Sequence, residues 1–135
     1  MDDATIRQRI LDHYAAAGID ERRVAEIYAD DVILDFPQGR ERIRGKENIV
    51  AFRSAYPAQV RIHPRRIVGS GDIWVIEGTI TYDGVPRYVA SIWEFRDGKV
   101  VHETSYVTEG WEPPAWRSQW VEPIADDPDS EEGRA

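Results

Sequence analysis

Four segments in the second half of the chain alternate between apolar and polar residues, and this pattern restricts the fold more than any other feature. They cover residues 59–68, 73–82, 87–96 and 99–108. Short turns separate them: residues 69–72 (GSGD), Asp83-Gly84 and Asp97-Gly98. Because Asp-Gly between alternating segments is typical of a two-residue hairpin, the pattern predicts an antiparallel meander. Pro64 places the first strand at an edge or at a bulge.

The first half of the chain has helical spacing. Apolar residues recur every three or four positions from Ile6 to Ala17, which predicts a helix that Asp3 or Thr5 caps and Gly18 ends. Four further elements follow in order: a short helix that Asp20 caps, a strand over residues 32–36, a polar loop over 39–45, and a helix over 46–56. The sequence therefore predicts an α+β fold, with helices packed on one face of a sheet. Long strands twist and curl, so we expect a conical cavity between the sheet and the helices.

Composition limits the possible environments and partners. The chain has 135 residues and a formal net charge of −8, which indicates one domain and argues against nucleic acid as a partner. It has no cysteine, no long apolar run and an acidic start, so we expect a cytoplasmic protein with no disulfide, signal peptide or membrane contact. Residues 126–135 hold five acids and one arginine, which predicts a disordered tail after a single domain over residues 1–125.

Three stretches resemble the nuclear transport factor 2-like superfamily, in its SnoaL-like branch. They are residues 28–37 (YADDVILDFP), 43–49 (IRGKENI) and 93–106 (WEFRDGKVVHETSY). The resemblance covers roughly residues 5–108 and implies a cone-shaped α+β barrel. It implies no single function, because this fold hosts isomerases, hydrolases, cyclases, dehydratases, transport factors and binding domains.

Two activities of that superfamily match the residues poorly. The resemblance places the base of a ketosteroid isomerase at Phe36 and its oxyanion acid near Ser91, and neither side chain has that chemistry. Tyr14 alone matches a tyrosine of such a site. An epoxide hydrolase of the limonene type would need an aspartate where this chain has Ser105. We therefore expect neither activity.

A polyketide cyclase of the SnoaL type would need an acid–base group on the late strands, where Glu77, His102 and Glu103 are available. Strand alternation separates His102 from Glu103 and Ser105. The resemblance puts Glu103 and Ser105 toward the cavity, so His102 would face outward.

The candidate catalytic residues are Asp35, Glu103 and Tyr14. If Asp35 faces the cavity, burial would raise its pKa and allow acid–base work; otherwise it caps a neighbouring loop. Glu103 would be a buried charge that needs a partner, either Arg53 or Arg87, and a structural ion pair is the alternative. Tyr14 is either a proton donor or core filling. The expected ligand-binding side chains are Phe36, Trp74, Glu77, Tyr88, Ser105 and Trp111.

Three tryptophans lie close together near the C-terminus. Trp111, Trp116 and Trp120 fall within ten residues, and so much aromatic surface has to be buried somewhere. Three outcomes are open: a lid over the cavity, packing across a dimer partner, or closure of the chain's own core.

These observations favour a pocket for a small hydrophobic molecule. It would either bind only or act as an isomerase, lyase or cyclase that needs no cofactor. We expect no metal site, because the three histidines lie far apart in sequence. The alternative is a non-catalytic homodimer or interaction module that uses Trp93, Phe95 and Val89 on the convex sheet face. A trafficking adaptor like the superfamily's namesake is a third, weaker candidate.

Overall fold

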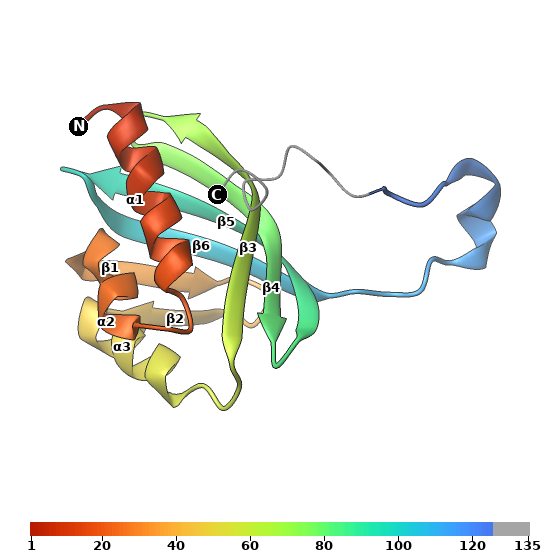
Figure 1. The fold of residues 1–135 in the computed structure, drawn as a ribbon, viewed down its shortest axis with the longest axis horizontal. Helices are drawn as coiled ribbons and strands as arrows, with labels where there is room; N and C mark the ends of the chain where they lie inside the picture. Colours follow the sequence, from red (N-terminus) through yellow and green to blue (C-terminus); the bar gives the residue numbers. More distant parts are fainter. Residues whose placement is uncertain (126–135) are drawn as a thin grey trace.

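The computed structural model describes residues 1–125, so the predicted tail over 126–135 lies outside the described residues. Residues 1–125 form three α-helices, two 3₁₀ helices and six strands, which Figure 1 shows as a ribbon. The helical elements are α1 (Asp3–Ala16), α2 (Glu21–Val24), η1 (Ala25–Ile27), α3 (Lys46–Ala55) and η2 (Ala115–Trp120). The strands are β1 (Tyr28–Phe36), β2 (Glu41–Arg44), β3 (Val60–Ser70), β4 (Ile73–Tyr82), β5 (Val85–Arg96) and β6 (Lys99–Glu109).

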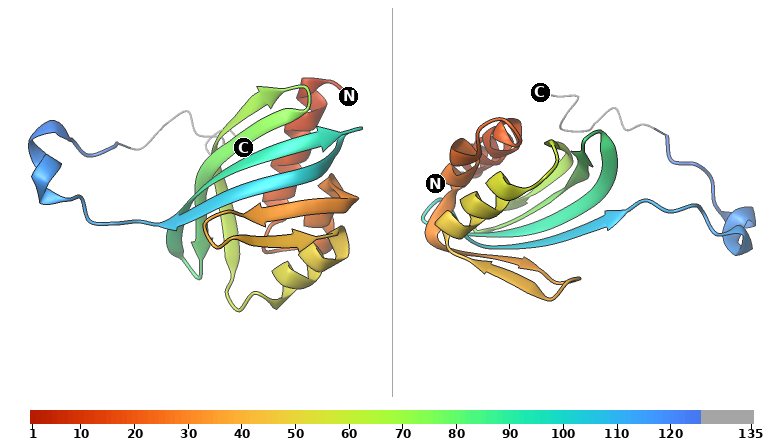
Figure 2. Two further views of the ribbon diagram at one scale, coloured as in Figure 1. Left: turned by 180° about the vertical axis from the view of Figure 1, so that it is seen from behind. Right: turned by 90° about the horizontal axis from the view of Figure 1, so that it is seen from below.

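The strands form one curved, unclosed sheet in the order β2-β1-β6-β5-β4-β3. β1 runs parallel to β6, and the other neighbouring strands are antiparallel. Figures 1 and 2 show the three helices gathered on the concave face of this sheet, with α1 crossing it and α3 beside β1 and β2. The predicted α+β architecture is confirmed. Among residues 1–125, no helix has the length and apolar character needed to cross a membrane.

The turns of the meander have the geometry that the sequence predicts. Asp83 and Gly84 both have positive φ (50° and 83°), and so do Asp97 and Gly98 (53° and 75°). Two successive left-handed residues match the right-handed twist of the strands that they join. β3 is an edge strand, and its register shifts between Pro64 and Arg66, so both predictions for this proline hold.

The strand that follows α2 is longer than predicted, and the predicted polar loop over residues 39–45 is wrong. β1 begins at Tyr28, and β2 pairs with it from Ile33↔Arg44 to Phe36↔Glu41. A tight turn makes this possible, because Arg40 takes a positive φ of 56° and the Gly39 amide donates to the Phe36 carbonyl. β2 is short, polar and at the sheet edge, so it lacks the apolar alternation that marks a strand in a sequence.

Helix α1 is capped one residue earlier than predicted. The Asp2 carboxylate accepts a hydrogen bond from the Thr5 amide at 2.8 Å. Asp3 instead ties the helix to the β3–β4 turn, where it accepts from the Ser70 hydroxyl at 2.7 Å and the Gly71 amide at 3.0 Å. Asp20 caps α2, as predicted, by accepting from the Arg23 amide.

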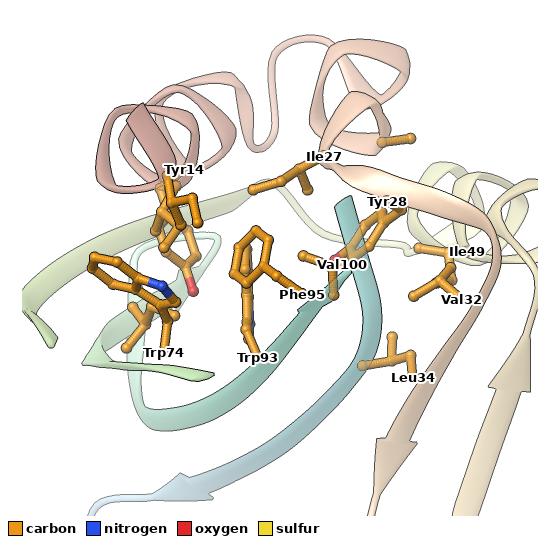
Figure 3. Close-up of a cluster of buried hydrophobic side chains, with 14 of the residues drawn as sticks. Tyr14, Ile27, Tyr28, Val32, Leu34, Ile49, Trp74, Trp93, Phe95 and Val100 are labelled. Carbon is orange, nitrogen blue, oxygen red and sulfur yellow. The ribbon is translucent and has the colours of Figure 1, made fainter. Parts of the chain in front are cut away.

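Aromatic and branched side chains fill the narrow end of the space between the helices and the sheet (Figure 3). Trp93 lies at the centre of this core, with its ring 4.9 Å from that of His13 and 5.7 Å from that of Tyr14. Trp74 and Phe95 pack beside it from neighbouring strands, and Leu34 closes the side formed by β1. Because the core fills this end, the cavity is confined to the wide end of the sheet.

Gly18, between α1 and α2, has a conformation and a contact that exclude side chains. Its φ is +76°, and a Cβ atom there would lie 1.9 Å from the Val60 carbonyl oxygen. We expect Gly18→Ala to lower the free energy of unfolding by about 3 kcal/mol, because backbone displacement adds to left-handed strain. Gly84→Ala is the matched control, since Gly84 has a φ of +83° with nothing within 4 Å, and should cost about 1 kcal/mol. Urea unfolding compares them, and equal losses would contradict the role of the Val60 contact.

Candidate ligand pocket

A pocket opens at the wide end of the curved sheet, with a cavity volume of about 100 Å³. Side chains from α1, α3, β1 and the four strands of the meander line it, and most of its wall is apolar. Two aromatic pairs stand at this wall: Phe36 with Phe52, whose ring centres are 5.9 Å apart, and Tyr56 with Tyr82, at 5.0 Å. Phe52 and Tyr56 are partly exposed. The pocket therefore joins an apolar interior to an aromatic rim.

A chain of hydrogen bonds crosses the inner wall of the pocket and meets at Glu103. Glu103 is 5% exposed, and its two carboxylate oxygens accept separate bonds. Oε1 accepts from the Tyr28 hydroxyl at 2.6 Å, and Oε2 accepts from the Ser105 hydroxyl at 2.7 Å. Behind Tyr28, the Arg53 guanidinium donates to the tyrosine oxygen at 3.0 Å. A buried carboxylate is thus held by donors on both sides.

The direction of each hydrogen bond in this series follows from the number of hydroxyl protons available. Ser105 has one hydroxyl proton and gives it to Glu103, so Ser91, whose oxygen lies 2.8 Å away, must donate to Ser105. Tyr14 lines the pocket beside Ser91. The hydroxyl protons of Tyr28, Ser105 and Ser91 therefore all point toward Glu103.

Burial and charge shift the groups around Glu103 in a consistent way. Burial raises the pKa of Tyr14, and Glu103 and Tyr28 raise it further. Burial also raises the pKa of Tyr28, against the opposing charge of Arg53. For Arg53, burial favours the neutral form, but the nearby Tyr28 and Glu103 outweigh it and the pKa is raised. Both tyrosines thus stay protonated donors at neutral pH, and Arg53 stays charged.

Four of the predicted site residues meet in this pocket: Tyr14, Phe36, Glu103 and Ser105. Alternation on β6 places Glu103 and Ser105 inward, as expected, and His102 outward. Of the two arginines considered for Glu103, Arg53 lies at the pocket, whereas Arg87 pairs with Glu109 at 3.3 Å.

The prediction that Asp35 faces the cavity is wrong. Asp35 lies on the outer face of β1, where Arg42 contacts both of its oxygens at 2.7 and 2.9 Å and His102 approaches Oδ2 at 2.8 Å. These contacts, Arg42 first and His102 after it, lower the pKa of Asp35 to about 2, although burial was expected to raise it. Asp35 is adjacent to Phe36, and only one of two adjacent residues can face inward on a strand.

Four predicted ligand-binding side chains lie outside the pocket. Trp74 is buried in the core instead. Glu77 is on the convex face, where Arg65 donates to it at 2.6 Å. Tyr88 is exposed, and Trp111 is 72% exposed on a segment that leaves the body. The alternation of their strands turns Glu77 and Tyr88 away from the pocket.

The prediction that Trp93, Phe95 and Val89 lie on the convex face is also wrong. Trp93 and Phe95 are buried in the core, and Val89 lines the pocket. The hypothesis that Trp111, Trp116 and Trp120 close the core of their own chain is wrong too, because all three are exposed.

Sequence reasoning missed Tyr28 and Ser91 as site residues and considered Arg53 only as a partner for Glu103. Arg53 follows the buried Ile49 by four positions on α3, so helical spacing alone places both on the inner face. Tyr28 carries no such signal, because it lies at the boundary where η1 ends and β1 begins.

Comparisons with known proteins identify the family and support the fold. A family model, the SnoaL-like domain, matches residues 8–103 of the chain. The chain belongs to the SnoaL-like family. No protein with a curated description matches this SnoaL-like chain.

Solved structures of the same fold are similar over most of its length. An NTF-2 like protein of unknown function from Burkholderia xenovorans LB400 is 45% identical, with a TM-score of 0.84, over 93% of this chain and 99% of the other. A protein from Kribbella flavida DSM 17836, proposed to be a ketosteroid isomerase, is 25% identical with a TM-score of 0.82 over 94% and 96%. A proposed SnoaL-like polyketide cyclase from Shewanella denitrificans OS-217 shares the fold at 12% identity, with a TM-score of 0.67 over 76% and 90%. The SnoaL-like fold thus includes proteins described as isomerases and as cyclases.

Proposed function

We propose that this SnoaL-like protein binds a small, mainly apolar molecule in the pocket and that Glu103 exchanges a proton with it. The observation that carries the proposal is the buried Glu103 carboxylate, held by Tyr28 and Ser105 in an otherwise apolar wall. Each carboxylate oxygen has two lone pairs and accepts one hydrogen bond from a neighbouring side chain of the protein. One lone pair on each oxygen is therefore left for a ligand. Pockets that bind small molecules combine apolar walls with a few placed polar groups in this way.

The size of the cavity limits the part of a ligand that enters it. An engineered apolar cavity of about 150 Å³ in another protein binds one benzene molecule. The volume of about 100 Å³ here is therefore suited to a ring-sized fragment or a short branched chain. A larger ligand would extend past Phe52 and Tyr56 at the rim.

The arrangement suits proton abstraction next to a carbonyl group. Glu103 would take a proton from the carbon, the electron pair would move to the carbonyl oxygen, and Arg53 would supply positive charge beside the developing oxyanion. Return of the proton to another carbon gives an isomerase, and loss of a leaving group gives a lyase. Such steps need no cofactor. Phe36 lines the pocket where the resemblance puts the isomerase base, so the base would come from β6 instead.

Thermal melting with a panel of small ketones, polyketide fragments and terpenoids tests this proposal. A ligand at about 100 times its dissociation constant adds about 2.7 kcal/mol to stability, so we expect at least one compound to raise the Tm of the wild type by about 5 °C or more. Glu103→Gln should lose most of this shift.

Asp35→Asn is the matched control, because it makes the same acid-to-amide change on the opposite face, and it should keep the shift. Proton exchange at the carbon next to the carbonyl, followed by NMR in D₂O, reports the chemistry. The absence of any shift, or an equal loss in both variants, would overturn the proposal.

A homodimer that only binds or interacts is the second candidate function. It rests on a different observation: the convex face of the sheet carries exposed apolar side chains, among them Val68, Ile73, Val75 and Ile92.

A further inference from the structure

The convex face carries a continuous row of exposed apolar side chains. Val68, Val75 and Ile92 lie directly opposite one another on β3, β4 and β5. Ile73, Tyr88 and Tyr106 extend this row along and across the strands, and we call these six residues the convex patch. Directly opposite side chains on one face of a sheet are about 5 Å apart and diagonal neighbours about 7–8 Å, which large apolar side chains can span.

A second exposed apolar surface lies on residues 110–125, which we call the arm. Figures 1 and 2 show the arm running on from the end of β6, away from the helices and the sheet. Trp111, Trp116 and Trp120 are 72%, 76% and 72% exposed, and Val121 and Ile124 are exposed as well. Three solvated tryptophans on one short segment are typical of a surface that binds a partner.

The two surfaces meet at Gly110. A Cβ atom there would lie 3.2 Å from the ring of Tyr88, so the arm leaves the body against the convex patch. The arm then runs outward in the direction of β6 and away from its own patch (Figure 2). Residues 111–114 lie outside any helix or strand and connect Gly110 to η2, so Trp116 can lie up to about 20 Å from Gly110. The rings thus lie beyond the body, where a second molecule could receive them.

We infer that the arm of one copy packs on the convex patch of a second copy, and that the second arm packs on the first patch in return. One chain carries both complementary surfaces, so a two-fold axis satisfies both and closes the assembly at two copies. This inference deepens the homodimer candidate and does not depend on the pocket.

The area involved is sufficient for a stable dimer. A tryptophan buries about 150–250 Å², so the six tryptophans of two arms bury about 900–1,500 Å² of their own surface. Stable protein interfaces bury about 1,200–2,000 Å² in total, and the patch residues add to the contribution of the arms. Each chain has a net charge of −8, so an apolar contact also has to overcome repulsion between the copies.

Solution mass at 10 µM, measured by light scattering after gel filtration, tests the inference. The wild type should have twice the 15.5 kDa of one chain, about 31 kDa. Two variants should be monomers: Val75→Glu in the patch, and the triple change of Trp111, Trp116 and Trp120 to Ser. Val85→Glu is the matched control, because Val85 is exposed at the β4–β5 turn outside the patch, and this variant should stay a dimer.

Circular dichroism and urea unfolding check that each variant folds. A monomeric wild type would overturn both the dimer and the arm contact. A dimer that survives the triple tryptophan change would overturn the arm contact and leave the homodimer candidate standing. A dimer that survives Val75→Glu would show that the arm docks elsewhere. Ligand binding plays no part in the readout, so the result is separate from the fate of the pocket proposal.

Discussion

The free energy of unfolding is expected to fall by about 2 to 3 kcal/mol between pH 7 and pH 4.5 because of His13 alone. His13 is 3% exposed, and its Nδ1 lies 2.8 Å from the Val24 carbonyl oxygen, which fixes the proton on that nitrogen. Burial first, and then the charge of Arg53, lower the pKa of His13 to about 3 from 6.5. The folded protein therefore keeps this ring neutral over a range in which the unfolded chain protonates it.

The sign of the effect follows from the protons bound in each state. Below pH 6.5 the unfolded chain takes up a proton at His13, and the folded chain does so only near pH 3. Stability is thus complete above pH 6.5 and declines by about 1.4 kcal/mol for each unit of pH below it, until the folded pKa is reached.

Urea unfolding at pH 7.5, 6.5, 5.5 and 4.5 measures this slope. His13→Asn keeps a donor for Val24 but cannot titrate, so it should be less stable at pH 7.5 and lose most of the decline down to pH 4.5. His63→Asn makes the same substitution at a half-buried position on β3 and is the control for the substitution itself. An unchanged slope in His13→Asn would show that another group causes the acid sensitivity.

The second large effect is expected at Glu103. Glu103→Ala removes the acceptor for Tyr28 and Ser105, and it removes the negative charge that helps to raise the pKa of Arg53. Leaving two buried donors without an acceptor costs about 1–3 kcal/mol each, so we expect a total loss of about 3–5 kcal/mol of stability. Glu103→Gln keeps an acceptor oxygen of the same shape and should cost about 1–2 kcal/mol.

Glu109→Ala is the matched control, because Glu109 is exposed on the same strand and its contact with Arg87 is at the surface. It should change stability by less than about 1 kcal/mol. A double-mutant cycle with Arg53→Met then isolates the coupling, which should exceed about 1 kcal/mol. Equal losses in Glu103→Ala and Glu109→Ala would mean that the buried chain of hydrogen bonds adds nothing to stability.

Local patterns in the sequence predict much of this fold. The Asp-Gly turns and the period of two define the meander, since backbone twist and side-chain alternation act over a few residues. On β6, the same alternation puts Glu103 and Ser105 on one face, and the resemblance to the superfamily predicts that this face points inward. On β1 the alternation of Val32, Leu34 and Phe36 with Ile33 and Asp35 held the same information. The prediction for Asp35 rested instead on an acidic residue in an apolar strand, next to Phe36.

Position along a strand is harder to predict than the face of the strand. Trp74 and Phe36 both point inward, but Trp74 fills the core and Phe36 lines the pocket. The difference depends on where the helices cross the sheet, which involves contacts between residues far apart in the chain. For the same reason, the sequence did not predict that Tyr28 would connect Arg53 to Glu103, since this contact joins α3, β1 and β6.

The sequence by itself determined the order of helices and strands except for β2, the meander turns, and the separation of Glu103 and Ser105 from His102 on opposite faces of β6. Each of these depends on residues within a few positions of one another. Only the tertiary structure decided which inward side chains meet at the open end of the sheet, that Asp35 faces outward toward Arg42 and His102, and that the tryptophan arm leaves the body. These outcomes depend on how distant segments pack, and packing is a property of the whole chain that no local pattern contains.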